Sequence, residues 1–475
     1  MSETSSKMLG ITVLPEYFQV EGIEPVLDNC QNIAGANAIT TSPYVMRLAA
    51  TGEGQREPPI DAGAGAVRIL DRPLWGKREL HVLTSPSFHA NKALYSKTCY
   101  EPPVGDRFTD QGGEIVAKAL RAIKKRGLTS YFQVQAAIPP GYRVQFSGVI
   151  DKDQPLLPNG NQVVNRVAKN ASLASEDILQ YQIALMLDLF QQYPDLDGIR
   201  LDWPEYPPYR FDSVFLDFNS QVAAHCESTE FFNNLRRSIA EIYSWVHSSL
   251  TNDAISRITD IPSLSGELRK LGYYDVLKEW LHLKRQLVTS YIARIHEAMH
   301  NAGFREKRLV PHAFPPPFHR LSGLDYGEVG KYSDHIPVKM YTMHWSMIAR
   351  FYLDQLTKAN PDIDEGELIR MVFALLSISD EASPEKISDV RYPGPDDPQL
   401  PTNRVQRHKI EFAQRQAGDT KIAALIHGYG PVDEFRNRFE LAFNEADNFA
   451  WVNRYCYLSD EKLRVMGEIS GGKEL

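Results

Sequence analysis

Residues 197–209 read DGIRLDWPEYPPY, and their order of polar and apolar side chains is the main guide to the architecture. Because side chains alternate across a strand, Arg200 and Asp202 share one face, and the apolar residues beside them share the other. A charged face turned to the axis and an apolar face packed under helices are typical of a strand in a closed parallel barrel. Pro204 cannot donate a ladder hydrogen bond, so it ends the strand and turns Glu205 into the mouth beside Asp202.

Other segments with β-branched and aromatic residues alternate with amphipathic stretches of helical period. The eight strands predicted in this way are 10–20, 79–84, 129–138, 196–203, 307–314, 335–343, 420–428 and 449–457. Eight strands with helices between them predict the α/β class, as a (β/α)8 TIM barrel with long βα loops.

The segments between the predicted strands divide into helices and loops. Helices are expected at 111–126, at 175–193 behind a Ser175 cap, and at 363–378. A helical insertion is expected after the fourth strand, at about 212–303, and long loops at 43–78 and 383–408. Since no repeat or linker interrupts the chain, residues 1–475 are expected to form one catalytic domain.

Composition limits the possible partners. The formal charge is −8 and no basic stripe is present, which disfavours nucleic-acid binding. No run reaches the roughly 20 apolar residues of a spanning helix, and the N-terminal residues lack a secretion-signal pattern. The four cysteines lie far apart without a CxxC pair, which predicts reduced thiols. These features favour a cytoplasmic protein without a membrane partner, and they leave the oligomeric state open.

The carboxyl groups of Asp202 and Glu205 suit glycoside hydrolysis, in which one carboxyl donates a proton and another, ionised, attacks the sugar or activates water. Asp202 is expected to be the nucleophile, base or charge stabiliser, since a buried Arg200 would lower its pKa. Glu205 is expected to be the proton donor, since aromatic neighbours would raise its pKa. The structural alternative is an ion pair between Arg200 and Asp202, with Glu205 as a solvated loop residue.

The same stretch resembles the fourth strand of barrel glycosidases. Gly198-x-Arg200-x-Asp202 is similar to the GxRxD motif of the α-amylase family, in which that Asp is the nucleophile. DGIRLDWPEYP also resembles the DGxDxDWEYP of chitinase-type enzymes, whose final Glu is the proton donor, although Arg200 replaces an Asp and Pro204 displaces the Glu by one place. The general pattern DGIxLDxxxYP is similar to that of poorly characterised glycosidase-like barrels, and the likeness extends over roughly 195–315.

Residues at the carboxyl ends of the other strands are expected to line the same mouth. Saccharide sites combine hydrogen-bonding groups with aromatic platforms, and the predicted substrate contacts of this kind are Arg200, Glu16, His312, Tyr341, His344, Trp345, His427 and Arg454. VKMYTMHW (338–345) resembles the sixth-strand MxYDxHGxW of chitinase-type barrels, which implies a substrate contact for Tyr341. The structural alternative for a lone His in a strand is a satisfied core residue.

Three alternatives remain open or are disfavoured at this point. Asp325 or Glu328, after the fifth strand, is the second choice of partner for Asp202. No HxH or GxSxG motif is present, and DAGAGAVRI (61–69) follows a loop, so neither a metal nor another cofactor is expected. The hypothesis is therefore an O-glycosidase acting on an oligo- or polysaccharide, and the alternative is a non-hydrolytic carbohydrate-binding or scaffold barrel.

Overall fold

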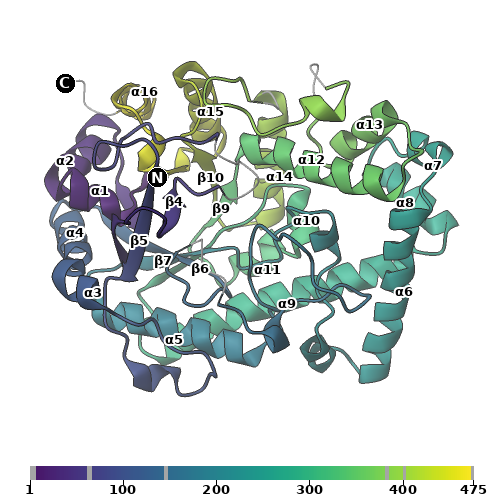
Figure 1. Ribbon diagram of the computed structural model, residues 1–475, viewed down its shortest axis with the longest axis horizontal. Helices are drawn as coiled ribbons and strands as arrows, with labels where there is room; N and C mark the ends of the chain where they lie inside the picture. Colours follow the sequence, from purple (N-terminus) through teal and green to yellow (C-terminus); the bar gives the residue numbers. More distant parts are fainter. Residues whose placement is uncertain (1–6, 61–66, 144–147, 380–383, 400–402, 472–475) are drawn as a thin grey trace, which may run out of the picture.

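The computed structural model describes residues 7–60, 67–143, 148–379, 384–399 and 403–471 (Figure 1). Its main sheet has eight parallel strands in the order β8-β7-β6-β2-β1-β11-β10-β9. They are β1 (Met8–Thr12), β2 (Ala38–Thr41), β6 (Thr129–Gln135), β7 (Gly198–Asp202), β8 (Arg308–Pro311), β9 (Ile336–Lys339), β10 (Ile422–His427) and β11 (Phe449–Asn453). Neighbours in the chain are neighbours in the sheet, with helices between them, so the predicted (β/α)8 fold is confirmed.

The barrel closes between β8 and β9, where the ladder is short. The Ala313 N–H donates to the Pro337 carbonyl (2.9 Å), and the Ala313 carbonyl accepts from the Lys339 N–H (2.9 Å). Near the other end of the strands, the Asp334 N–H donates to the Leu309 carbonyl (3.0 Å). Every other pair of neighbouring barrel strands is joined by a ladder of three to five paired residues, so this seam is the least bonded.

Helices surround the strands, and they include the predicted ones. They are α1 (Pro15–Val20), α2 (Ile23–Asp28), α3 (Arg107–Gly112), α4 (Glu114–Lys125), α5 (Glu176–Gln192), α10 (Phe318–Ser322), α11 (Tyr326–Gly330), α12 (Thr342–Ala359), α13 (Glu365–Leu375), α14 (Asn403–Ala417), α15 (Val432–Glu445) and α16 (Asp460–Ser470), besides those of the insertion. Segments 111–126, 175–193 and 363–378 correspond to α4, α5 and α13. Ser175 caps α5, since its Oγ accepts from the Ile178 N–H (3.3 Å). No helix in the described part of the chain is long and apolar enough to cross a membrane.

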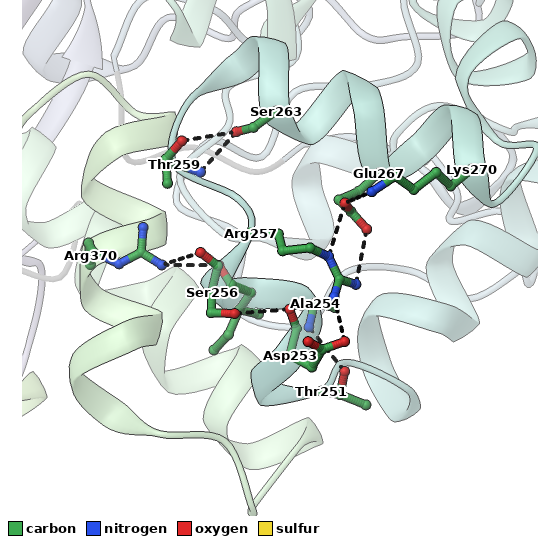
Figure 2. A network of polar contacts seen from close by, with 11 residues as sticks. Thr251, Asp253, Ala254, Ser256, Arg257, Thr259, Ser263, Glu267, Lys270 and Arg370 are labelled. Carbon is green, nitrogen blue, oxygen red and sulfur yellow. Dashed lines mark hydrogen bonds and ion pairs between the residues drawn. The ribbon is translucent and has the colours of Figure 1, made fainter.

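The predicted insertion is helical, and it consists mainly of α6 (Thr229–Ser248), α7 (Asn252–Ser256), α8 (Ile261–Lys270) and α9 (Tyr274–Asn301). Figure 1 shows α6, α7 and α8 on the side of the molecule away from α1, α2 and α4. Figure 2 shows how α7 and α8 are held: Arg257 pairs with Glu267 (3.1 Å), and Arg370 of α13 donates to the Ser256 carbonyl (3.3 Å). The hydrogen bond from Arg370 thereby links the insertion to α13, a helix of the barrel wall.

One predicted barrel strand is wrong. The segment predicted at 79–84 coincides with most of β5 (Leu80–Pro86), which pairs antiparallel with β3 (Tyr44–Leu48) and β4 (Gln55–Glu57) in a separate three-stranded sheet. The second barrel strand is instead β2, whose four residues AITT are too few to show a period. The segment 43–78 was expected to be a loop, yet it contains β3 and β4. Of the glycine cluster 61–69, residues 61–66 lie outside the described residues.

Several predicted strands are longer than the observed ones, and two of these differences affect the site. The segment 10–20 leaves the strand after Thr12 and becomes α1, because Pro15 starts a helix favourably at its first position. Likewise, β9 ends at Lys339 and α12 begins at Thr342, so residues expected at the end of that strand lie on a helix. Both differences change where predicted site residues lie: Glu16 is on α1, and His344 and Trp345 are on α12.

Candidate active site

Arg200 points to the barrel axis, as predicted. Its Nη1 donates to Thr12 Oγ1 (3.0 Å) and Thr40 Oγ1 (2.9 Å) on β1 and β2, and its guanidinium lies 3.9 Å from the centre of the Trp451 ring on β11. Burial lowers the pKa of Arg200 to about 9. Arg200 therefore supports the inner end of the site, and in the described structure its hydrogen bonds go to the two threonines and not to Asp202.

Asp202 is held by three other strands. Lys339 Nζ of β9 lies 2.7 Å from Oδ1, His312 Nδ1 lies 3.2 Å from the same oxygen, and Gln133 Nε2 of β6 donates to Oδ2 (3.2 Å). Burial alone would raise the pKa of Asp202, but the Lys339 charge and the His312 hydrogen bond outweigh it and hold that pKa well below its usual range. Asp202 is ionised, and its ion-pair partner is Lys339.

His312 is neutral at this position. Burial, with the nearby Arg200 charge, lowers the pKa of His312 to about 3. Nδ1 then carries the hydrogen that is donated to Asp202, which leaves Nε2 as an acceptor. Among the described residues Nε2 has no hydrogen-bond partner, although the ring is fully buried.

The turn after Asp202 is strained. Trp203 has a φ of 57°, in the left-handed region, and a bulky side chain there costs about 1–2 kcal/mol. Strain of this kind persists where the surrounding structure enforces it, often at functional sites. The strained residue stands between Asp202 and the Pro204-Glu205 pair, so it sets the direction in which Glu205 leaves the strand.

Glu205 is fully buried, which differs from the solvated residue of the structural alternative. Its Oε1 accepts from the Phe314 N–H (3.1 Å), and its Oε2 accepts from Ser322 Oγ (2.5 Å). Burial raises the pKa of Glu205 to about 7, against the opposing effects of Lys339 and Ser322. The two carboxyl groups of the turn thus favour opposite protonation states.

A second buried acid pair lies beside the first and was only partly predicted. Glu57 of β4 forms an ion pair with Arg143 (2.7 Å), and both side chains are buried. Glu16, on α1, lies close by: burial first, and then the Glu57 charge, raise the pKa of Glu16 to about 7. Glu16 therefore lies near Glu57 and Arg143, and it does so from a helix and not from a strand.

A cavity of about 30 Å³ lies at this part of the mouth. It is lined by Leu14, Ser42, Tyr44, Glu57, Pro59, Gln133, Gln135, Tyr142, Arg143 and Arg454. Gln133 both lines the cavity and donates to Asp202, so the cavity and the ionised carboxylate are adjacent. Of the predicted contacts, Glu16 and Arg454 belong to this region.

Gln133, Gln135, Glu57 and Arg143 are not among the predicted site residues. The two glutamines occupy alternate positions at the carboxyl end of β6, with Val134 between them, and this pattern was a usable signal for an inward polar face. Glu57 and Arg143 lie outside the barrel strands and carry no comparable signal.

The remaining predicted contacts divide into two groups. Tyr341 accepts from Asn453 Nδ2 (2.6 Å), and its ring centre is 5.3 Å from those of both His344 and His427. Burial, with nearby positive charges, lowers the pKa of His427 well below its usual value. These three rings lie together. Trp345 lies on α12, where its ring centre is 5.1 Å from Lys409 Nζ.

The reserve acids Asp325 and Glu328 have other partners. Asp325 caps α11 and lies 3.5 Å from Arg285, and Glu328 pairs with Lys331 (2.7 Å) with more than half of its side chain exposed. In the described structure neither has a recorded contact with Asp202.

One group of side chains could offer three ligand atoms to a metal. Potential ligand atoms of Cys99, Asp153 and Asp177 lie within 4.8 Å of one another. However, Lys152 Nζ already pairs with Asp177 (2.6 Å), and the Asp153 carboxylate accepts from Tyr100 (2.7 Å) among others. The contacts of this group are those of a network of hydrogen bonds and ion pairs around the buried Asp153.

No family model matches the chain, and no curated protein matches it. Solved structures similar to it include the β-amylase catalytic domain of Paenibacillus polymyxa, with 11% identity, a TM-score of 0.48, and coverage of 98% of this chain and 99% of that one. A β-galactosidase from the psychrophilic Marinomonas ef1 has 10% identity and a TM-score of 0.46; 94% of this chain is covered but only 54% of that chain. A class V chitinase from Pseudomonas fluorescens Pf-5 has 9% identity, a TM-score of 0.43, and coverage of 98% and 99%.

Proposed function

We propose that this protein is a glycoside hydrolase that acts on an oligo- or polysaccharide through Asp202 and Glu205. One observation carries the proposal: the surroundings of two buried carboxyl groups on one turn shift their pKa values in opposite directions. The pKa of Asp202 lies well below its usual range, and that of Glu205 is raised to about 7. Pairs of acids whose environments separate their pKa values are the arrangement that glycoside cleavage needs.

In the proposed reaction, Glu205 gives its proton to the leaving glycosidic oxygen. Asp202 either bonds to the anomeric carbon or takes a proton from the water that does so. Lys339 keeps Asp202 charged before the reaction, and neutral His312 fixes its orientation through Nδ1.

The second candidate is a non-hydrolytic carbohydrate-binding barrel, and a specific observation favours it. Both oxygens of Glu205 already accept hydrogen bonds, and the residue has no exposed surface. A proton donor must reach the leaving oxygen. If the protein is a non-hydrolytic carbohydrate-binding barrel, Glu205 therefore only stabilises the conformation of the turn through its hydrogen bonds.

Hydrolysis of α- and β-linked 4-nitrophenyl glycosides and of oligosaccharides by the purified protein distinguishes the candidates. Asp202→Asn and Glu205→Gln are each expected to lower turnover by about 100- to 10,000-fold while the protein remains folded by circular dichroism. Asp325→Asn is the matched control, and full activity is expected. Full activity in Asp202→Asn, or no turnover with saccharide binding intact in the wild type, contradicts the hydrolase proposal.

A further inference from the structure

The longest helix of the insertion, α9 (Tyr274–Asn301), carries a motif that the proposed hydrolase does not use. Residues 296–300 read HEAMH, which matches the metal-binding pattern HExxH. Of the 13 histidines of the chain, His296 and His300 alone lie within four residues of each other. Residues four apart share one face of a helix, and the pair lies in the last two turns of α9. The helix therefore presents both imidazoles on the same side.

The two imidazole rings lie next to each other. Their centres are 3.9 Å apart, and their planes are tilted by 49°. Both side chains are half-buried, and Glu297 is exposed. A zinc ion about 2.0–2.1 Å from one nitrogen of each ring brings those nitrogens to about 3.3 Å from each other. Rotation about the side-chain torsions is enough to reach this arrangement, since the helix already holds the rings close together.

Both imidazoles are available to a ligand. In the described part of the chain, neither His296 nor His300 has a side-chain hydrogen bond or an ion pair. Their ring contacts are with each other and, for His296, with the Tyr332 ring, whose centre is 5.9 Å away. Burial, and then the His300 charge, lower the pKa of His296. A neutral imidazole has the free lone pair with which histidine binds a metal.

The ligand types indicate which metal fits and what kind of site it forms. Neutral imidazoles suit Zn²⁺ and Cu²⁺, whereas Mg²⁺ and Ca²⁺ prefer oxygen ligands. A catalytic zinc ion has three protein ligands. No described histidine, cysteine or acidic residue completes His296 and His300 into a group of three. The pair therefore lacks the third ligand with which an HExxH helix becomes the centre of a zinc peptidase.

The position of the pair also favours a structural role. α9 packs against α5 on the outside of the barrel (Figure 1), and its last turns lead toward the amino end of β8. Asp202 lies instead at the carboxyl end of β7. In this fold the carboxyl ends of the strands carry catalysis, and the opposite face contributes to stability. A metal that bridges residues four apart requires the helical form, so it stabilises the folded state.

We propose that His296 and His300 form a structural binding site for Zn²⁺, with water completing the coordination of the ion. The site is separate from Asp202 and Glu205, and the inference does not rest on the proposed hydrolase function. It assigns to this chain a metal ligand that stabilises the end of α9.

Isothermal titration of the protein, prepared without an added polyhistidine tag, with ZnCl₂ tests the site. We expect one Zn²⁺ to bind per chain. His296→Gln and His300→Gln should each weaken this binding by about 10- to 100-fold, because a single imidazole loses the advantage of two linked ligands. The matched controls are His282→Gln, which removes another imidazole of α9, and Glu297→Gln, and both should keep the affinity. Unchanged affinity in the His296 and His300 variants, or an equal loss in a control, overturns the assignment.

A spectroscopic measurement identifies the ligands in the wild-type protein. Cu²⁺ favours the same imidazole ligands, so its electron paramagnetic resonance spectrum at a one-to-one ratio should show nitrogen hyperfine splitting from two imidazoles. A spectrum without nitrogen splitting overturns the assignment.

Thermal unfolding tests the structural role. Zn²⁺ at 100 times its Kd should raise the Tm by about 2–3 °C in the wild type and should have no effect in the double variant His296→Gln/His300→Gln. Removal of Zn²⁺ with EDTA should leave any glycosidase activity unchanged. An equal Tm shift in the double variant overturns the site, and loss of activity with EDTA overturns its structural role.

Discussion

Lys339 Nζ lies 2.7 Å from Asp202 Oδ1, and this contact joins two strand ends with β8 between them. His312, just after β8, contacts the same oxygen (3.2 Å), whereas Gln133 of β6 takes the other oxygen (3.2 Å). Asp202, at the end of β7, therefore contacts side chains from β6, from the residue just after β8 and from β9.

Lys339→Met should destabilise the fold near neutral pH by about 3–5 kcal/mol, because it leaves a buried charge unpaired. In the wild type the depressed pKa of Asp202 adds stability above the unfolded pKa, and this is lost as pH falls. Without Lys339, burial dominates and raises the pKa, so stability falls as pH rises above about 4. Urea unfolding from pH 4 to 8 should show a difference between the two proteins that grows with pH. Adding Asp202→Asn to the variant should remove that growth, and a difference independent of pH would refute the account.

Glu205→Gln should flatten the pH dependence of stability. Glu205 has a pKa of about 7 in the fold against 4.5 as its usual value, so folding takes up a proton between these values. Its contribution is complete below pH 4.5 and is lost as pH rises through 7, which amounts to about 3 kcal/mol. The change in unfolding free energy between pH 4.5 and 8 should be smaller by that amount in the variant. An identical slope in both proteins is the contrary result.

Ser322→Ala should raise the pKa of Glu205, because the Ser322 hydroxyl donates to its Oε2 and lowers the pKa. The alkaline limb of the pH profile of kcat/KM should then move to higher pH, with Glu205 remaining the proton donor. Ser333→Ala, which removes a hydroxyl bonded to the Val329 carbonyl (2.7 Å), serves as the control. A limb that stays in place or moves to lower pH contradicts the assignment.

Gly10→Ala should destabilise the barrel by about 1–3 kcal/mol or more through overpacking. A Cβ at Gly10 would lie 2.1 Å from the Trp451 ring, which also stacks under Arg200. Gly266→Ala in α8 meets nothing within 4 Å and should stabilise by about 0.5–1 kcal/mol. Urea unfolding of both variants checks the pair, and equal effects would show that Gly10 has more room than the contact implies.

The barrel was predictable because most of its strands differ clearly from their flanking helices. The segment around Asp202 gave both the inward face and the turn, since alternation and Pro204 act locally. β2 could not be predicted, because its four residues are too few to show a period. β5 has the same sequence pattern as a barrel strand, and only its antiparallel pairing shows that it belongs to another sheet.

The acids at the mouth were predictable in type but not in pairing. Arg200 is two residues from Asp202 on the same face, so a local pair was the natural expectation. Lys339 lies 137 positions along the chain and becomes the partner only through barrel closure. Glu57 and Arg143 are brought together from segments outside the barrel strands, and no local pattern reports such a contact.

The seam between β8 and β9 has a consequence for motion. Local opening occurs where hydrogen bonds are fewest, so the amide hydrogens of Ala313 and Lys339 should exchange with solvent sooner than those of β7. His312 and Lys339 lie on either side of that seam. Each transient separation of β8 and β9 would therefore weaken the contact of one or both residues with Asp202. Local opening of the barrel at this seam and the ionisation of Asp202 are therefore coupled.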